Sequence, residues 1–206
     1  MKLLIAALCC TLVPCAATTI SFTGSLNSGD ANVVLPFTLT QASAITIRTF
    51  GYAGGTNGAS TLISAGGFDP FVVLYDSLGD SIALNDDGGC ANVGTDPVTQ
   101  SCADSLIVNN LLAGDYQVSV TQTGNILNTT NLADGFTQTG NATYACDPFS
   151  VAGQFCDTSN GALRTADWAL DITFDAPEPP QGVPEPSAWM TAATGLALLG
   201  YTRRRK

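Results

Sequence analysis

The sequence contains no histidine, and this absence excludes several common kinds of catalytic site. Ser-His-Asp and Cys-His arrangements use an imidazole as the general base, and many zinc sites use it as a ligand. Glutamate is almost as scarce. The chain has two, Glu178 and Glu185, and both stand in a Pro-rich stretch. A glycosidase pair would need two aspartates, and no pair stands out. We therefore expect a protein that is not an enzyme.

Positive charge is the second shortage. Between residues 18 and 183, fifteen aspartates and one glutamate stand against two cations, Arg48 and Arg164, which gives a net charge of −14 with no lysine. Such a surface repels nucleic acid and anionic lipid headgroups. The composition therefore argues against nucleic-acid binding. Divalent cations would reduce the mutual repulsion of the negative charges in residues 18–183.

Long hydrophobic runs are missing except near the two ends of the chain. Residues 1–17, MKLLIAALCCTLVPCAA, have one cation at Lys2, then an apolar run, then small residues up to Ala17. This order is typical of a secretory signal peptide that signal peptidase removes after Ala17. The apolar run is too short to span a bilayer, and Pro14 before Cys15 fits a lipoprotein site poorly. We expect the body to be exported.

The apolar run near the C-terminus, Ala188–Tyr201, is also short. Its 14 residues would form a helix of about 21 Å, whereas the hydrocarbon core of a bilayer is about 30 Å thick. Such a helix spans only a thinned bilayer. A basic cluster follows it and should stay cytoplasmic, which places residues 18–182 outside the inner membrane. The cluster consists of Arg203, Arg204, Arg205 and Lys206.

A short Pro-Glu-Pro motif precedes this apolar run, namely Val183, Pro184, Glu185 and Pro186. The motif, the run and the basic cluster, over residues 183–206, together resemble the PEP-CTERM sorting signal of bacterial envelope proteins. The resemblance implies recognition by an exosortase-type transpeptidase, cleavage near the Pro-Glu-Pro, and a transient stay in the inner membrane. Release to the cell surface or an exopolysaccharide matrix would follow. A permanent tail anchor is the alternative.

The body, residues 18–175, shows the two-residue alternation of half-buried β-strands. The clearest case is DWALDITFD at 167–175, and the continuous apolar run FVVLY at 71–75 is expected to be a central strand buried on both faces. No stretch before residue 187 has convincing helical periodicity. Seven or eight short strands with Gly- and Asp-rich turns predict an all-β fold, an antiparallel β-sandwich or jelly roll. Other expected strands lie at 19–24, 33–39, 44–50 and 116–121.

Two polar inserts and a spacer complete the predicted organisation. Residues 86–103 and 122–165 are expected to be surface loops that contain no more than short strands. Residues 176–186 form a Pro-rich, extended spacer. Residues 187–206 are predicted to be the short transmembrane helix with its basic tail.

Four of the seven cysteines remain once the signal peptide is removed, and an even number in an exported chain indicates disulfides. Three connectivities are open, of which local pairing is favoured because each local pair flanks loop-like sequence. Each loop closure would stabilise the fold by about 3 kcal/mol. A four-cysteine zinc site is the alternative, but its spacings would be unusual. The favoured pairs are Cys90 with Cys102 and Cys146 with Cys156.

The middle of the body carries a second resemblance. The pattern F-D-P-x-x-x-L-Y-D-S-x-G begins at Phe68, N-D-D-G follows at residue 85, and L-x-A-G-D-Y-x-V-x-V begins at Leu111. These residues resemble the bacterial pre-peptidase C-terminal domain family, whose members are jelly-roll sandwiches of secreted enzymes and surface proteins. Some members bind calcium through loop carboxylates and some bind polymers such as collagen. The chain keeps the corresponding Asp69, Asp76, Asp86 and Asp87. We expect no peptidase domain within residues 1–206.

Calcium also makes chemical sense here, because it takes six to eight oxygen ligands from carboxylates and backbone carbonyls of loops. Asp69, Asp86, Asp87 and Asp104 all lie at predicted strand ends, so they are expected to gather on one edge of the sandwich. The alternative is that each aspartate simply caps the backbone of its own turn.

Three functions follow from these observations. The first is a noncatalytic surface or exopolysaccharide-matrix protein, sorted through its C-terminal signal and bridged by calcium. The second is a carbohydrate- or protein-binding adhesin domain, for which Phe50, Tyr52, Phe136 and Tyr144 are candidates to stack on sugars unless they pack in the core. The third, a secreted hydrolase, is the least favoured because of the missing histidine.

Overall fold

The computed structural model describes residues 17–146, 153–157 and 160–175. By its contacts the chain separates into two units, Met1–Ala176 and Pro177–Lys206, and all of the described residues belong to the first. Apart from Ala17, the predicted signal peptide, spacer, transmembrane helix and sorting signal therefore lie outside the described residues. Within the described ranges, no helix is both long enough and apolar enough to cross a membrane.

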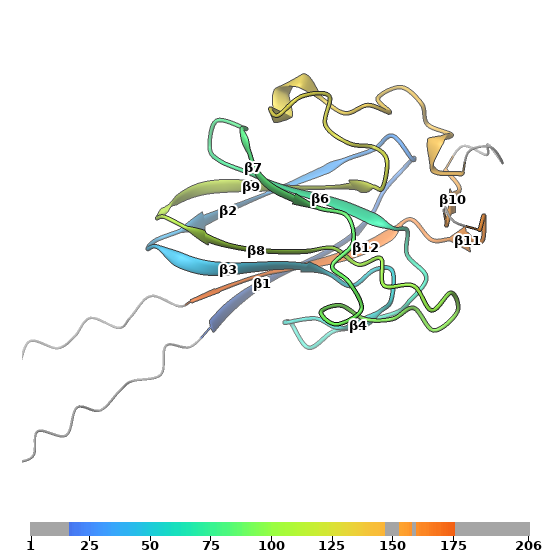
Figure 1. Cartoon of the computed structure of the whole chain (residues 1–206), viewed down its shortest axis with the longest axis horizontal. Coiled ribbons are helices and arrows are strands. Elements are labelled where there is room, and N and C mark those ends of the chain that lie inside the picture. The colour runs from blue at the N-terminus through green and yellow to red at the C-terminus, as the bar shows by residue number, and fades with distance from the viewer. Residues whose placement is uncertain (1–16, 147–152, 158–159, 176–206) are drawn as a thin grey trace, which may run out of the picture. The chain divides into compact units, whose positions relative to one another are not determined.

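Eight of the strands form two four-stranded antiparallel sheets that pack face to face (Figure 1). Successive strands mostly alternate between the sheets, and the resulting order is that of a jelly roll. The predicted antiparallel β-sandwich is thereby confirmed. The first sheet has the order β1 (Ala17–Ser25), β12 (Asp167–Asp175), β3 (Ser43–Thr49) and β8 (Leu106–Leu111). The second has the order β2 (Val33–Leu39), β9 (Gly114–Gln122), β6 (Pro70–Tyr75) and β7 (Ser81–Asn85).

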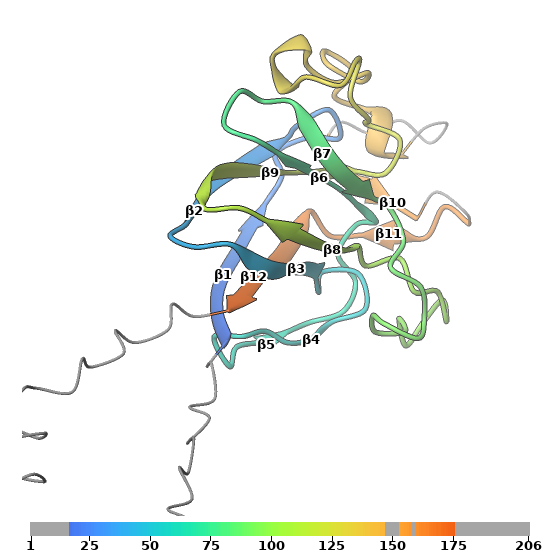
Figure 2. The ribbon, with the colours of Figure 1, turned by 60° about the vertical axis from the view of Figure 1, so that its left-hand side comes forward.

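The first and last strands of the body, β1 and β12, pair with each other along nine residues. On β12, Trp168, Leu170 and Ile172 point into the core between the sheets, as the alternation predicts. Asp171 points to the other side, where its carboxylate accepts a hydrogen bond from the Gly58 amide at 2.6 Å. This bond ties the small hairpin of β4 (Gly55–Thr56) and β5 (Leu62–Ile63) to the outside of the first sheet (Figure 2).

The apolar run FVVLY forms β6, an interior strand of the second sheet, and every residue of β6 is buried. Val72 and Leu74 pack in the main core between the sheets. Phe71, Val73 and Tyr75 form a second cluster on the outer face, covered by Leu127 and Leu132 of the long insert. A strand covered on both faces has no need of polar alternation, which explains the continuous run.

The two inserts are closed by the two predicted disulfides. Cys90 is bonded to Cys102 and Cys146 to Cys156, with Cα–Cα distances of 5.1 and 4.9 Å. Local pairing is confirmed, and the sulfurs are used in disulfides rather than in a zinc site. The described part of the second insert contains short elements: the 3-10 turns η1 (Leu132–Asp134) and η2 (Tyr144–Cys146), and the strand pair β10 (Phe155–Cys156) and β11 (Leu163–Arg164).

The core positions predict a clear difference in stability between matched leucines. Leu170 is 0% exposed between the sheets, whereas Leu62 of β5 is 79% exposed. Leu170→Ala should lower the free energy of unfolding by about 3 kcal/mol, because it removes buried methyl groups and leaves a cavity. Leu62→Ala should change it by less than about 0.5 kcal/mol. Urea unfolding measures both, and equal losses would contradict this placement of the core.

Candidate functional site

One end of the sandwich holds a pocket of about 540 Å³ lined mainly by polar residues. The strands of the second sheet are antiparallel, so the start of β6 meets the ends of β7 and β9 there. Asp69 directly precedes β6, Asp86 directly follows β7, and Thr123 directly follows β9. Sheet geometry alone therefore brings side chains from three distant parts of the sequence to one place.

Asp69 is the carboxyl whose titration the pocket changes most clearly. Its Oδ1 atom is buried and has no hydrogen-bond partner. Burial raises the pKa of Asp69 to about 8, and the negative charges of Asp86 and Asp87 act in the same direction. A carboxylate in such a place loses water without gaining a partner, so the protonated form is favoured.

Asp86 and Asp87 line the same pocket as Asp69. The Asp86 carboxylate accepts a hydrogen bond from the Thr123 hydroxyl at 2.8 Å. Partial burial of this carboxyl raises the pKa of Asp86; the Thr123 bond opposes the shift and the Asp87 charge adds to it. Three of the aspartates selected from the sequence are thus brought together with few compensating positive charges.

Asp104 lies close behind the pocket, but its carboxylate already accepts three hydrogen bonds from the protein. It accepts hydrogen bonds from the Thr49 hydroxyl at 2.9 Å and from the amides of Tyr52 at 3.2 Å and Ala53 at 2.9 Å. Its residue is 1% exposed. Burial raises the pKa of Asp104, against the lowering effect of these bonds. Asp104 therefore fixes the loop after β3 rather than facing the pocket.

Asp76 lies at the far end of β6 from Asp69. Its carboxylate accepts hydrogen bonds from the amides of Leu78 at 2.9 Å and Asp80 at 3.0 Å, which makes it the cap of the β6–β7 turn. This is the turn-capping role that aspartate favours. The structure does not bring Asp76 together with the pocket carboxylates.

An ion-pair network beneath the pocket is the feature that the sequence did not reveal. The Arg164 side chain, 4% exposed, contacts Asp96 at 3.2 Å and Asp157 at 3.3 Å. Its guanidinium stands 3.9 Å from the centre of the Tyr52 ring, and the Tyr52 hydroxyl donates to Asp157 at 2.5 Å. Tyr52 and Asp157 also line the pocket. The one sign of this network in the sequence is that the body has only two cations, Arg48 and Arg164.

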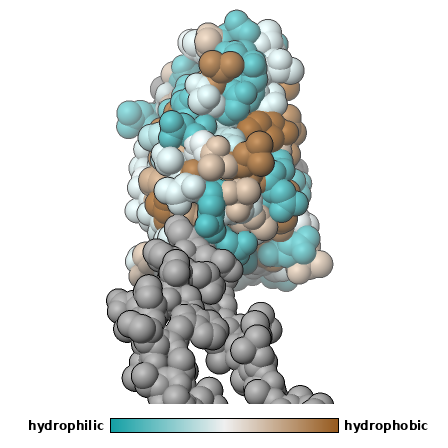
Figure 3. Space-filling view, turned by 90° about the vertical axis from the view of Figure 1, so that its left-hand side faces the viewer, coloured by the Kyte–Doolittle hydropathy of each residue, from teal (hydrophilic) through white to brown (hydrophobic). Residues whose placement is uncertain are grey.

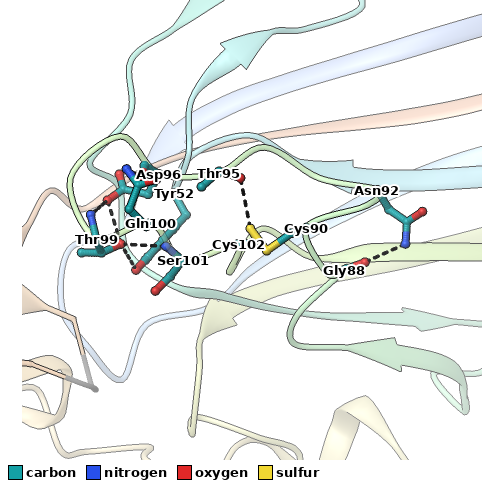
Figure 4. The surroundings of a disulfide bond; sticks show 10 residues. All are labelled: Tyr52, Gly88, Cys90, Asn92, Thr95, Asp96, Thr99, Gln100, Ser101 and Cys102. Carbon is teal, nitrogen blue, oxygen red and sulfur yellow. Dashed lines mark hydrogen bonds between the residues drawn. A yellow bond between two sulfur atoms is a disulfide. The ribbon is translucent and has the colours of Figure 1, made fainter.

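The Arg164 network holds the first disulfide loop in shape. Burial alone would raise the pKa of Asp96, but hydrogen bonds from Thr99 and Arg164 outweigh it and hold that pKa below its ordinary value. Figure 4 shows Asp96, Thr99 and Tyr52 pointing toward one another at one end of the loop that Cys90–Cys102 closes. At the other end, the Asn92 side-chain amide donates to the Gly88 carbonyl at 3.0 Å.

The pocket has oxygen ligands for a hard cation but not a closely gathered set of them. Among residues 17–146, 153–157 and 160–175, no group of three or more Asp, Glu, Cys or His side chains is placed so that it could hold a metal ion as it stands. Asp69, Asp86, Asp87 and the Thr123 hydroxyl are the residues that could hold a cation, and their carboxylates would have to close around it.

The aromatic candidates for sugar stacking are mostly in the interior. Phe50, Tyr52 and Phe136 are 8%, 1% and 3% exposed, so their ring faces are covered by protein. Tyr144 is partly buried and its hydroxyl donates to the Thr123 carbonyl at 3.0 Å. Packing, the alternative stated above for these residues, is what the structure shows.

Comparison with known proteins gives a single kind of similarity. No protein-family model matches the chain, and no curated protein sequence matches it. Among solved structures, it is similar to the crystal structure of the pre-peptidase C-terminal domain of collagenase from Bacillus anthracis. The two are 14% identical, the match covers 76% of this chain and 89% of that one, and the TM-score is 0.36. Similarity at this level does not bear on function.

The raised pKa of Asp69 predicts that the free energy of unfolding decreases as the pH rises from about 4 to about 8. The unfolded chain releases the Asp69 proton near 3.8, whereas the folded protein keeps it until about 8. In this window the folded state holds one proton more, so the free energy of unfolding falls with pH, by at most about 1.4 kcal/mol per unit.

Asp69→Asn should flatten this pH dependence and stabilise the protein at pH 8, because asparagine replaces the protonated carboxyl. The matched control is Asp80→Asn, which lies outside the pocket at the other end of β7 and should keep the wild-type slope. Urea unfolding in calcium-free buffer between pH 5 and 8 measures both. A wild-type slope that survives unchanged in Asp69→Asn would refute the assignment.

Proposed function

We propose that this chain is a noncatalytic exported protein of the cell surface or exopolysaccharide matrix, whose β-sandwich takes calcium in the acidic pocket. The observation that carries this proposal is the pocket itself: Asp69, Asp86 and Asp87 meet there, and Asp69 has a buried oxygen without a partner. No histidine or lysine accompanies them in the body, so no imidazole or amine is available there as a general base or nucleophile.

Calcium would remove the electrostatic cost of this pocket. Burial and the neighbouring negative charges keep Asp69 protonated. A divalent cation would compensate both by pairing with the carboxylate, and the flexible coordination of calcium suits carboxylates from separate loops. The Asp69 proton would leave as the ion enters. The net charge of −14 on the body gives a further reason for divalent cations to bind, either in the pocket or between molecules.

Calcium should therefore raise the melting temperature of the protein after treatment with chelator. At one hundred times the dissociation constant, the gain in the free energy of unfolding would be about 2.7 kcal/mol. Asp86→Ala combined with Asp87→Ala should abolish the gain, since it removes two pocket carboxylates. Differential scanning calorimetry with and without calcium measures the shift.

A matched control removes the same two charges elsewhere. Asp80→Ala with Asp115→Ala changes residues at the opposite ends of β7 and β9 from the pocket. This control should retain the calcium shift. If the pocket variant keeps the shift as well, calcium binds elsewhere and this part of the proposal is wrong.

The sorting part of the proposal rests on the two ends of the sequence. The signal-peptide pattern at 1–17 and the PEP-CTERM resemblance at 183–206 surround a body with two disulfides, a combination suited to an oxidising exterior. In this proposal, signal peptidase and an exosortase-type enzyme process the chain, and the inner membrane holds it only transiently.

Intact-mass measurement on the protein from its own host tests the sorting proposal. Membrane, surface and medium fractions should be compared. We expect the surface and medium species to lack residues 1–17 and everything after about residue 186, because both ends are addresses. A complete C-terminus found only in the membrane fraction would instead identify a permanent anchor.

A further inference from the structure

One wall of the acidic pocket contains the disulfide between Cys90 and Cys102. The two cysteines are twelve residues apart in the sequence, and the covalent bond ties the segment after β7 to the segment before β8. Both segments contribute further lining residues: Asp86, Asp87 and Gly89 from the first, Ser101 and Ala103 from the second. The disulfide therefore joins two parts of the wall that carry the pocket residues.

Asp86 and Asp87 are held in this wall in different ways. The Asp86 carbonyl accepts a hydrogen bond from Ser105 Oγ at 2.7 Å, and the Asp86 carboxylate accepts one from the Thr123 hydroxyl at 2.8 Å. Asp87 is exposed, and its carbonyl accepts a longer bond, at 3.3 Å, from the Asn85 side chain. The position of Asp87 thus depends more on the segment that follows it.

The segment that follows Asp87 is fixed at two points. At the first, the Gly88 amide donates to the Asp104 carbonyl at 2.9 Å. A Cβ added at Gly88 would lie 2.6 Å from Val93 Cγ1, so the backbone is closely packed there. The second point is the disulfide at Cys90. Without it, the Gly88–Asp104 hydrogen bond would have to keep this exposed segment against the one before β8.

The two disulfides differ in how easily a reductant can reach them. Cys90 is exposed, although its partner Cys102 is 8% exposed. Cys146 and Cys156 are 2% and 4% exposed, so the second disulfide is buried at both ends. Because thiol–disulfide exchange needs a thiolate to attack a sulfur atom, access controls its rate. A thiol reductant should therefore react first with the disulfide of the pocket wall.

The pocket lies at the end of the sandwich away from the two ends of β1 and β12 that pair at Ala17 and Asp175. Figure 3 views the molecule from the Ala17–Asp175 side, where hydrophilic and hydrophobic side chains are mixed. The other end of β12 lies near the pocket, since Thr165 bridges to Gly67 there. A body held through residue 175 would present the pocket and its disulfide away from the attachment.

We propose that the Cys90–Cys102 disulfide positions the calcium site, so that calcium binds tightly only while this disulfide is intact. The inference rests on the proposed binding of calcium in the acidic pocket. Reduction by an external dithiol adds two electrons and two protons to the disulfide, which gives two thiols, and the dithiol becomes a disulfide in turn. Residues 87–90 are then free to move away from residues 101–103, and Asp87 leaves the other oxygen ligands.

The same coupling must also act in the reverse direction. If the oxidised protein binds calcium about tenfold more tightly than the reduced protein, calcium must favour the disulfide over the two thiols by the same factor. For this two-electron couple, a tenfold factor lowers the reduction potential by about 30 mV. Oxidation of Cys90 and Cys102 after export and binding of calcium would therefore strengthen each other.

Isothermal titration calorimetry with calcium on the full chain tests this proposal. Cys90→Ser with Cys102→Ser should weaken calcium binding at least about tenfold, because the two segments of the pocket wall are no longer joined. Cys146→Ser with Cys156→Ser is the matched control. It removes the disulfide whose sulfurs lie outside the pocket wall, and it should change the affinity less than about threefold. Circular dichroism checks that both variants fold.

A redox titration of the unaltered protein provides the test if either cysteine variant fails to fold. Mixtures of reduced and oxidised dithiothreitol, with chelator or with calcium, set the reduced fraction of Cys90–Cys102, which alkylation and peptide mass spectrometry measure. Calcium should raise the ratio of reduced to oxidised dithiothreitol at half reduction by at least about tenfold. Asp86→Ala with Asp87→Ala keeps both cysteines and should lose this effect.

The outcomes separate this inference from the calcium proposal on which it rests. Unaltered, oxidised protein that binds no calcium would remove both. Calcium binding that is equally tight with and without the Cys90–Cys102 disulfide would overturn the inference alone, as would a redox titration that calcium leaves unchanged. Reduction that unfolds the whole sandwich, seen by circular dichroism, would also overturn it, because the disulfide would then act on the fold rather than on the pocket.

Discussion

The contact of Arg164 with Asp96, Asp157 and Tyr52 is the interaction on which the architecture around the pocket depends. It joins residues that are 68 and 7 positions away from Arg164 in the sequence, and a ring from the loop after β3. The guanidinium is buried, so each of its partners is buried with it. Removing one member of such a network leaves an uncompensated charge in the interior, which is costly. The two disulfide-closed inserts are thereby held on the same end of the sandwich.

The Arg164 guanidinium is paired with Asp96 and Asp157 beneath the pocket. The other carboxylates that line the pocket, those of Asp69, Asp86 and Asp87, therefore have little positive charge to compensate them. Burial raises the pKa of Asp69 and of Asp86, and the neighbouring carboxylates add to both shifts. The carboxylates of Asp104 and Asp76 instead accept hydrogen bonds from backbone amides. The same scarcity of positive charge appears on the surface, where β7 ends in exposed carboxylates and the strand between them is apolar. The acidic pocket thus reflects the composition of a body with two arginines and no lysine.

Much of the fold follows from local pattern. The alternation in DWALDITFD and the continuous FVVLY run each predicted a strand, and both strands are found. FVVLY is buried on both faces as expected, whereas β12 is more buried than the half-buried strand expected, since all of its residues from Trp168 to Ile172 are buried. The disulfides could be predicted because each closes a short loop. The meeting of Asp69 with Asp86 and Asp87 could also be predicted, since consecutive antiparallel strands bring their ends together. The Arg164 network could not, because it depends on how two inserts fold back over the sandwich. Nor could the different roles of Asp104 and Asp69, since hydrogen bonds from distant backbone distinguish two otherwise similar turn residues.

The most direct measurement is carbon NMR titration of the aspartate carboxyl groups, first without calcium and then with it. The electrostatics of the pocket predict that Asp69 titrates near pH 8 in chelator, and that calcium moves its titration several units lower because the ion favours the carboxylate. Titration of Asp69 near pH 4 without calcium would contradict the uncompensated pocket, and with it the reason for a cation to bind there. A midpoint near 8 that calcium leaves unchanged would keep the pocket but remove calcium from it.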